Sequence, residues 1–180
     1  MSNVYFIGDL HFGHSNICKF RPFPTEAAHR GHLMQKWIER ISKRDVVFVL
    51  GDAAFTQEGL DDIDVLPGRK ILVRGNHDLL PTECYMKVFE EVYGMLAYKG
   101  LWLTHAPMHP SELFGRSNVH GHSHRGGPTT VHISGDSSRG YQTGSKATYF
   151  NTCCEHLPVP YVPMNYHDVM AHIKERIRTS

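Results

Sequence analysis

The chain has 180 residues, of which 41% are hydrophobic and 21% are charged, an ordinary composition for a globular protein with a sizeable core. Its 19 basic and 18 acidic residues give a net charge of +1, so a protein that binds nucleic-acid backbones is not favoured. No apolar run reaches the length of a membrane span, and we expect no membrane partner. We expect a single domain over residues 1–180.

The cysteines and the first residues bear on the cellular compartment. Cys18 and Cys84 stand apart, Cys153 and Cys154 are adjacent, and none has CxxC spacing, so we expect reduced thiols. The chain begins with a strand-like apolar run and not with a basic and then apolar leader. These features predict a cytoplasmic protein.

The hydrophobic pattern of the first half of the chain predicts strands that alternate with helices. Short apolar runs rich in β-branched and aromatic residues predict buried strands at 4–7, 45–50 and 70–73. Between them, helical spacing predicts helices at 25–42, beginning near Thr25, and at 57–65. Strands joined in this way form α/β sheets, in which ligands bind at the carboxyl ends of the strands.

The second half predicts hairpins and a closing helix. In chain order we expect a helix at 82–91, a hairpin of 93–98 and 101–104, strands at 117–120 and 147–151, and a helix at 165–178. The Gly-, Ser- and Thr-rich stretch 126–146 predicts an exposed loop or a mobile hairpin, and it is the candidate for a partial lid.

Oxygen and imidazole side chains follow five of the predicted strands at the point where each strand ends. They are Asp9 and His11, Asp52, Asn76 with His77 and Asp78, His105, and His122 with His124. Each one alone fits a turn residue, a helix cap or a core histidine. Gathered at one sheet edge, unpaired buried carboxylates would cost roughly several kcal/mol each, a difficulty that a shared cation removes.

The donor types limit the choice of metal. Oxygen and imidazole ligands without thiolate suit Mn, Fe, Co, Ni or Zn. Seven candidate ligands are too many for one tetrahedral ion. They favour two ions about 3.5–4 Å apart that share one bridging carboxylate.

The ordered motifs resemble those of the calcineurin-like metallophosphoesterase superfamily. They are Asp9-x-His11, Gly51-Asp52, Gly75-Asn76-His77-Asp78, His105 and Gly121-His122-x-His124, all in order across residues 9–124. The resemblance implies an α/β (α+β) fold, a four-layer α-β-β-α sandwich of two mixed sheets flanked by helices. It implies two divalent transition-metal ions, Mn²⁺ first, with Fe, Ni, Co or Zn as alternatives. One would be held by Asp9, His11, Asp52 and His124, and the other by Asp52, Asn76, His105 and His122.

The same resemblance implies catalytic roles. A hydroxide that bridges the metals would attack phosphorus in line, and His77 would donate a proton to the leaving oxygen. Asp78 would hold the other nitrogen of the His77 ring. Arg74 is either a clamp on a phosphate oxygen or a surface charge. His14 and Asn16 are either substrate contacts or parts of an ordinary loop.

The remaining cations and histidines give weaker expectations. Arg21 and Arg125 are candidate phosphate-facing cations. His29 is expected at the surface. His120 should point away from the metals, because it alternates with His122 along a strand.

A chain of this size leaves no room for a large cap domain. Small members of the superfamily often cleave phosphodiesters, so we expect a phosphodiesterase for a small, nucleotide-like phosphoester. A phosphomonoesterase is the alternative among enzymes, and the near-neutral charge gives no support to a nuclease. A catalytically silent metal-binding interaction scaffold, as in the retromer coat, is the alternative from another class. The presence of His77 and Asp78 argues against that scaffold.

Overall fold

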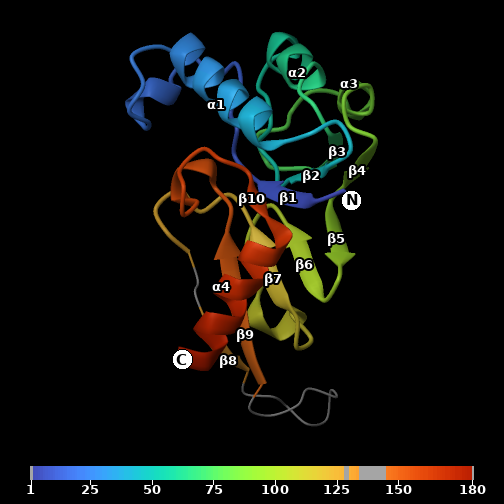
Figure 1. Ribbon diagram of the computed structural model, residues 1–180, viewed down its shortest axis with the longest axis vertical. Coiled ribbons are helices and arrows are strands. Elements are labelled where there is room, and N and C mark those ends of the chain that lie inside the picture. Colours follow the sequence, from blue (N-terminus) through green and yellow to red (C-terminus); the bar gives the residue numbers. More distant parts are fainter. Residues whose placement is uncertain (1, 128–129, 134–144, 180) are drawn as a thin grey trace.

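The computed structural model describes residues 2–127, 130–133 and 145–179. Two five-stranded mixed sheets pack together and are flanked by helices (Figure 1). Buried side chains from both sheets, such as Phe48 and Leu103, belong to one contiguous hydrophobic cluster. This is the α/β sandwich that the motifs implied.

The first sheet has the order β10-β1-β2-β3-β4. Its strands are β1 (Val4–Ile7), β2 (Val46–Val49), β3 (Arg69–Val73), β4 (Glu91–Tyr93) and β10 (Met164–Asn165). β1 to β4 are parallel and β10 runs antiparallel on the edge. The central strands are apolar along their length because helices cover one face and the second sheet covers the other.

The two crossover helices begin where the sequence predicts. α1 (Glu26–Arg40) follows Thr25, whose hydroxyl accepts a hydrogen bond from the Ala28 amide at 3.1 Å. α2 (Gln57–Asp64) follows Thr56, which caps Gly59 at the same distance. Such caps satisfy amides that the first turn of a helix leaves unpaired. Both helices lie with the short helix α3 (Thr82–Tyr85) on the outer side of the first sheet (Figure 1).

The second sheet has the order β5-β6-β7-β9-β8. Its strands are β5 (Met95–Tyr98), β6 (Leu101–Thr104), β7 (Ser117–His120), β8 (Thr130–Ile133) and β9 (Ser145–Asn151). β6, β7 and β9 are parallel, so their carboxyl ends share one edge. The predicted closing helix is α4 (Tyr166–Thr179), which packs along β9.

The region between the two sheets corrects the sequence prediction. The expected helix at 82–91 is only α3 (Thr82–Tyr85), and the chain is already extended again at β4. Tyr93 pairs with β3 in the first sheet instead of opening the hairpin, which consists of β5 and β6 alone. Pairing with a distant strand decides these residues, and local periodicity carries no signal for it.

The predicted loop at 126–146 contains part of a strand pair. β8 runs antiparallel to β9, and β9 begins two residues before the predicted strand at 147. Residues 128–129 and 134–144 of that stretch lie outside the described residues. The mobile loop and the lid that we expected there therefore stay predictions.

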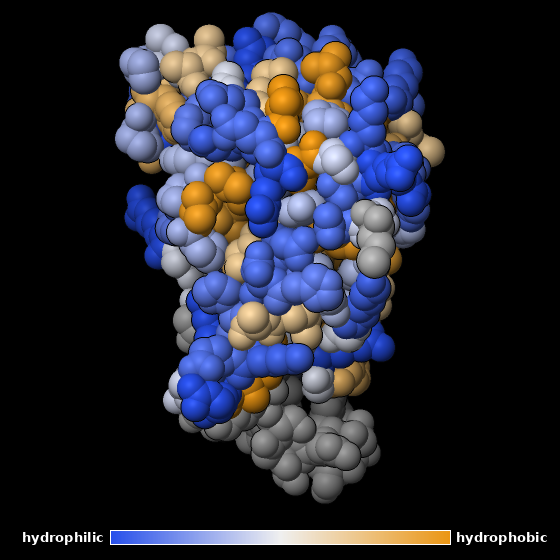
Figure 2. Space-filling view, viewed as in Figure 1, coloured by the Kyte–Doolittle hydropathy of each residue, from blue (hydrophilic) through white to orange (hydrophobic). Residues whose placement is uncertain are grey.

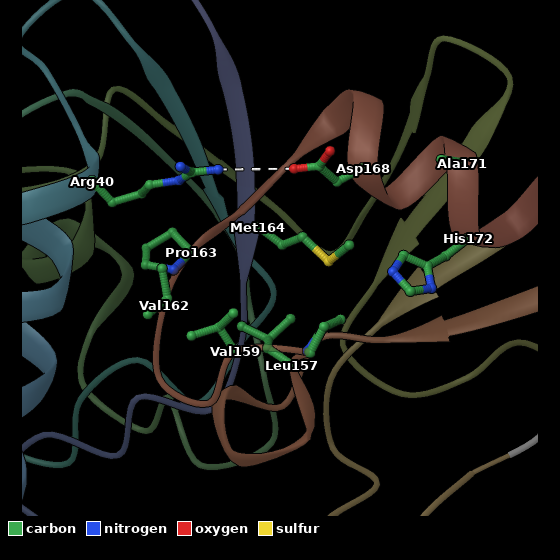
Figure 3. Close-up of a pocket in the computed structure, with 10 residues that line it drawn as sticks. Arg40, Leu157, Val159, Val162, Pro163, Met164, Asp168, Ala171 and His172 are labelled. Atoms are coloured by element: carbon green, nitrogen blue, oxygen red, sulfur yellow. Dashed lines mark ion pairs between the residues drawn. The ribbon is translucent and has the colours of Figure 1, made fainter.

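The face shown in Figure 2 is largely hydrophilic, with small separate hydrophobic patches. Within the described ranges, no helix combines the length and the apolar character needed to cross a membrane. A cavity of about 340 Å³ lies between the end of α1, β10 and α4, with the Arg40–Asp168 ion pair beside it (Figure 3). None of the predicted metal ligands lines it.

Candidate metal centre

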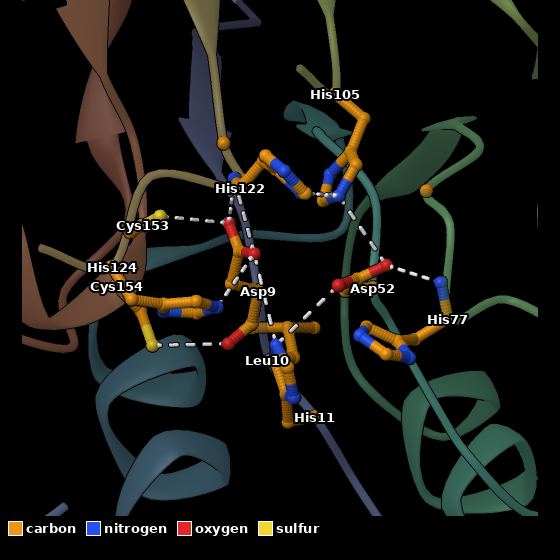
Figure 4. Close-up of polar contacts among 12 residues, drawn as sticks. Asp9, Leu10, His11, Asp52, His77, His105, His122, His124, Cys153 and Cys154 are labelled. Carbon is orange, nitrogen blue, oxygen red and sulfur yellow. Dashed lines mark hydrogen bonds and ion pairs between the residues drawn. The ribbon is translucent and has the colours of Figure 1, made fainter. Parts of the chain in front are cut away.

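The turns that follow β1, β2, β3, β6 and β7 meet at one edge of the sandwich. They bring together all seven predicted ligands, which are Asp9, His11, Asp52, Asn76, His105, His122 and His124. Figure 4 shows the carboxylates of Asp9 and Asp52 in the middle of the group, with imidazoles on either side. Parallel strands end at the same edge, and the predicted convergence follows from that topology.

The backbone of these turns is unusual. Asp9, His11, Asp52 and His122 have φ values of 59°, 55°, 51° and 66°, in the left-handed region. A non-glycine residue there costs about 1–2 kcal/mol, so the conformation persists only where the surroundings hold it. Such residues cluster at functional sites, as they do here.

The first ligand cluster consists of Asp9, His11, His124 and one oxygen of Asp52. The Nε2 atom of His11 lies 3.7 Å from Asp9 Oδ1 and 3.6 Å from Asp52 Oδ2. The Nε2 atom of His124 lies 3.4 Å from Asp9 Oδ1. These pairs lie beyond ordinary hydrogen-bond lengths. Ligand atoms of Asp9, His124 and Cys153, and also of Asp9, Asp52 and His105, lie within 4.8 Å of one another and could hold a metal ion.

His11 is the most informative member of this cluster. Its side chain is buried, and neither ring nitrogen has a hydrogen-bond partner among the described residues. An unsatisfied buried polar group costs roughly 1–3 kcal/mol. Burial also lowers the pKa of His11 and keeps the ring neutral, the form that binds metals. A cation at Nε2 would remove part of this cost.

The second ligand cluster consists of Asn76, His105, His122 and the other oxygen of Asp52. Asn76 Oδ1 lies 2.9 Å from His105 Nε2 and 2.9 Å from His122 Nδ1. The two ring nitrogens are 3.2 Å apart, and His105 Nε2 lies 3.4 Å from Asp52 Oδ1. Three imidazole and amide donor atoms thus converge beside one carboxylate oxygen.

Asp52 stands between the two clusters. Its Oδ2 faces His11 and its Oδ1 faces His105, and the side chain is buried. One carboxylate that presents one oxygen to each of two donor clusters is suited to bridge two cations. The nitrogen and oxygen donor set fits a pair of divalent transition-metal ions.

Two glycines allow the backbone to approach the carboxylates. A Cβ atom on Gly75 would lie 2.2 Å from Asp52 Oδ1, and one on Gly121 would lie 2.4 Å from Asp9 Oδ2. Any side chain at these positions would displace a candidate ligand. The glycines of the motifs are therefore steric requirements of the site.

Arg21 lies beneath the site and does not face a phosphate, so that prediction is wrong. Its side chain is buried, and its guanidinium donates to the backbone oxygen of Asp9 at 2.7 Å and to Glu155 at 2.7 Å. His29, expected at the surface, is buried, with Nε2 2.9 Å from the same guanidinium. Burial and then the charge of Arg21 lower the pKa of His29 to about 3.

Glu155 contacts the candidate site, and the sequence prediction missed it. Its Oε1 lies 2.6 Å from His124 Nδ1, which leaves His124 Nε2 directed toward Asp9. Burial would raise the pKa of Glu155, but His124 and Arg21 lower it to about 2. A carboxylate behind a ligating imidazole fixes its tautomer and orientation.

Cys153 was also missed as part of the site. Its Sγ lies 3.1 Å from Asp9 Oδ2, and burial raises the pKa of the thiol, so the thiol donates and the carboxylate accepts. The amide of His122 donates to the same carboxylate at 3.0 Å. All four cysteines are free thiols, as predicted.

The candidate general acid His77 lies at the rim of the site. His77 is exposed, and its ring centroid is 6.1 Å from that of His11. Its backbone amide donates to Asp52 Oδ1 at 2.8 Å, which ties the loop to the bridging carboxylate. Phe55 stacks against the imidazole at 5.2 Å.

Asp78 differs from its expected role. Its carboxylate is buried and accepts hydrogen bonds from the backbone amides of Asp52, Ala53 and Gly75 at 2.8–2.9 Å. Those bonds occupy both oxygens, and the carboxylate fixes the shape of the loop instead of holding the His77 ring. Burial, which exceeds the effect of these bonds, raises the pKa of Asp78.

Arg74 also braces this loop. Its guanidinium donates to the backbone oxygens of Asp78 and Leu80 at 2.6–2.9 Å and to the Thr82 hydroxyl at 2.7 Å. Four of its five N–H donors are occupied in this way. The structure thus places Arg74 as a support of the turn that carries His77, and not as a free phosphate clamp.

The other residues singled out in the sequence lie at the rim of the site, on the surface or in the core. His14 is half-buried at the rim and stacks on Phe55 at 4.6 Å, and Asn16 is exposed with no side-chain cap bond. Arg125 is exposed in the turn after His124. His120 is buried, with Nδ1 2.7 Å from the Gly121 oxygen, and belongs to neither ligand cluster.

Comparison with known proteins identifies the family and the fold. The sequence profile of the calcineurin-like phosphoesterase family matches residues 2–151, a range that contains all seven candidate ligands. The solved structure of a protein of unknown function from Aquifex aeolicus superposes with a TM-score of 0.68 at 25% identity, covering 95% of this chain and 99% of that one.

Two curated relatives are similar in sequence. A protein of Methanocaldococcus jannaschii is 30% identical over 133 residues, which cover 69% of this chain and 70% of that protein. The Gene 66 protein of Mycobacterium phage D29 is 43% identical over 83 residues, 43% of this chain and only 41% of the phage protein. The family profile covers most of the chain, and the chain therefore belongs to the calcineurin-like phosphoesterase family.

Proposed function

We propose that this protein is a phosphodiesterase that uses two divalent metal ions to hydrolyse a small, nucleotide-like phosphodiester. The observation that carries the proposal is the position of Asp52, whose two oxygens face two separate donor clusters. Membership of the family supports a metal-dependent phosphoester hydrolase. The diester preference and the substrate class are the proposed part.

The residues of the candidate site divide into metal ligands and one proton donor. Asp9, His11 and His124 would hold one ion, Asn76, His105 and His122 the other, and Asp52 both. When bound, the ions supply Lewis-acid stabilisation of the charge on the transferred phosphoryl group. We propose Mn²⁺ as the bound ion, with Fe, Ni, Co or Zn as alternatives, and the nitrogen and oxygen donors fit all of these ions.

His77 is the proposed general acid. Its ring is exposed beside the clusters, while its backbone is tied to Asp52 and its face is packed on Phe55. An imidazole held in this way can donate a proton to the leaving oxygen of the ester. Asp78 and Arg74 position the loop, and His14 and Asn16 are proposed to contact the substrate.

The candidate site is open to solvent. Asn76 and His77 are exposed, so the phosphate site opens directly to solvent. We also propose one domain over residues 1–180 and a cytoplasmic location, which the four free thiols support.

The experiment compares hydrolysis of bis-p-nitrophenyl phosphate and p-nitrophenyl phosphate by chelator-stripped protein, with and without Mn²⁺. We expect Mn²⁺-dependent cleavage with a higher kcat/KM for the diester. His77→Ala should lower kcat about 10²- to 10⁴-fold for a diester with an alkoxide leaving group. The loss should be smaller for p-nitrophenolate, which leaves without protonation. His167→Ala, an exposed histidine on α4, is the control.

The other outcomes separate the alternatives. Cleavage of the monoester alone would replace the diesterase by a phosphomonoesterase. If no cleavage occurs with Mn²⁺, Fe²⁺, Ni²⁺, Co²⁺ or Zn²⁺, two bound ions would point to a substrate unlike these esters, and protein without two bound ions would favour the interaction scaffold. Asp52→Asn should lower the metal content as well as the rate, because it removes the negative charge of the bridging carboxylate and replaces one of its two oxygens by an amide nitrogen.

A further inference from the structure

Four aromatic rings form a row that begins at the metal centre. The rings of His77 and Phe55 stack at 5.2 Å with an interplanar angle of 22°, and those of Phe55 and His14 at 4.6 Å and 11°. His14 is followed by Phe20 at 6.4 Å and 33°. Phe55 lies 5.3 Å from the ring of the candidate ligand His11. The row thus leads from a metal ligand outward.

Phe20 ends this row and is 74% exposed. The ring is nevertheless carried by a rigid turn. Phe20 follows the short helix η1 (Ile17–Lys19), whose Ile17 is buried, and it precedes the buried Arg21. The Arg21 guanidinium donates to the backbone oxygen of Asp9 at 2.7 Å, so the turn is fixed directly to a metal-binding strand end.

An exposed aromatic face held on a rigid turn can stack on a planar aromatic ring with little loss of conformational entropy. Stacking of a nucleobase on an aromatic side chain contributes about 1–3 kcal/mol and tolerates any base. The imidazole of His14 adds a second ring beside it. A phosphate held at the metal centre places the rest of the same molecule next to this row.

We propose that Phe20 and His14 form a subsite for the nucleobase of a phosphoester whose phosphate is held at the metal centre. Phe55, packed between His14 and His77, positions both imidazoles. This inference rests on the proposed function and narrows its substrate class to phosphoesters that carry a planar aromatic group. Phe20 determines this specificity and takes no part in the chemical step.

The test measures the dissociation constants of AMP and ribose 5-phosphate for Mn²⁺-loaded protein by calorimetry. The two ligands share the phosphate and the sugar and differ by the base. We expect the wild type to bind AMP about tenfold more tightly. Phe20→Ala should reduce this ratio to about one without changing the ribose 5-phosphate constant, and Phe20→Trp should keep it.

Val65→Ala is the matched control, since Val65 is also 74% exposed, at the far end of α2. The proposed subsite would be wrong if the wild type bound AMP and ribose 5-phosphate equally tightly, or if Phe20→Ala kept the wild-type preference for AMP. If ribose 5-phosphate still binds in a metal-dependent way in that case, the proposed function stands without it. Failure of both ligands to bind, together with no hydrolysis of the nitrophenyl esters, would overturn both proposals.

Discussion

Glu155 Oε1 and His124 Nδ1 lie 2.6 Å apart, although 31 residues separate them in the chain. The contact turns the other nitrogen of His124 toward Asp9, and Arg21 holds the second oxygen of Glu155. Glu155 therefore aligns the candidate metal ligand His124 from the segment that follows β9, outside the range matched by the family profile.

Glu155→Gln should weaken binding of the first metal ion about 10- to 100-fold, the usual cost of removing a carboxylate behind a ligating histidine. Competition titration with a chromophoric chelator measures this affinity. Glu175→Gln, which removes an exposed carboxylate paired with Arg178, is the control. An affinity within twofold of the wild type would show that His124 needs no such support.

Gly75→Ala tests the close packing around the bridging carboxylate. The added Cβ would lie 2.2 Å from Asp52 Oδ1 and 2.4 Å from its amide nitrogen, so Asp52 must move. Because misplacement of a reacting group by about 1 Å can cost on the order of 10²-fold, we expect kcat to fall by that order and metal content to fall below two ions.

The control is Gly94→Ala, since a Cβ there meets nothing within 4 Å. Its kcat and metal content should equal those of the wild type. If Gly75→Ala retained both ions and full activity, the backbone would have to shift to accept the added Cβ without moving the Asp52 carboxylate.

Arg74→Ala distinguishes a loop brace from a phosphate clamp. Loss of its hydrogen bonds to the turn should lower the free energy of unfolding by about 2 kcal/mol and the Tm by about 4–8 °C. The value of kcat should fall because the turn carries His77, with KM little changed. Arg178→Ala, an exposed arginine, is the control. A raised KM with an unchanged Tm would instead show that Arg74 binds the phosphate of the substrate.

His29 makes stability depend on pH in a defined direction. Burial and then Arg21 lower its pKa to about 3, against about 6.5 in the unfolded chain, so the unfolded state takes up a proton first. The contribution of the neutral His29 is present above pH 6.5 and is lost as the pH falls toward 3. Unfolding of metal-free protein by urea at a series of pH values measures it.

The variant His29→Gln lacks the pH-dependent stabilisation by neutral His29. The difference in unfolding free energy between the wild type and this variant should therefore shrink as the pH falls from 6.5 to 3. His167→Gln should leave the pH dependence unchanged. A constant difference for His29→Gln across this range would show that the buried ring titrates as it does in the unfolded chain.

The convergence of the seven candidate ligands was predictable because each member follows an apolar run and a parallel sheet brings such strand ends together. The sequence did not predict the roles of Glu155 and Cys153 or the burial of Arg21, because no motif marks these residues. The Arg21–Glu155 contact joins residues 134 positions apart, and the Cys153–Asp9 contact joins residues 144 positions apart. The role of Asp78 was misjudged for a similar reason. Its partners are backbone amides of the loop after β2, and backbone partners leave no trace in residue identity.

The central claim is a pair of metal ions bridged by Asp52, and anomalous diffraction from Mn²⁺-loaded crystals at the manganese edge tests it most directly. We predict two peaks about 3.5–4 Å apart, one on each side of the Asp52 carboxylate. One should lie among Asp9, His11 and His124, and the other among Asn76, His105 and His122. A single peak, or two peaks of which neither contacts Asp52, would contradict the account.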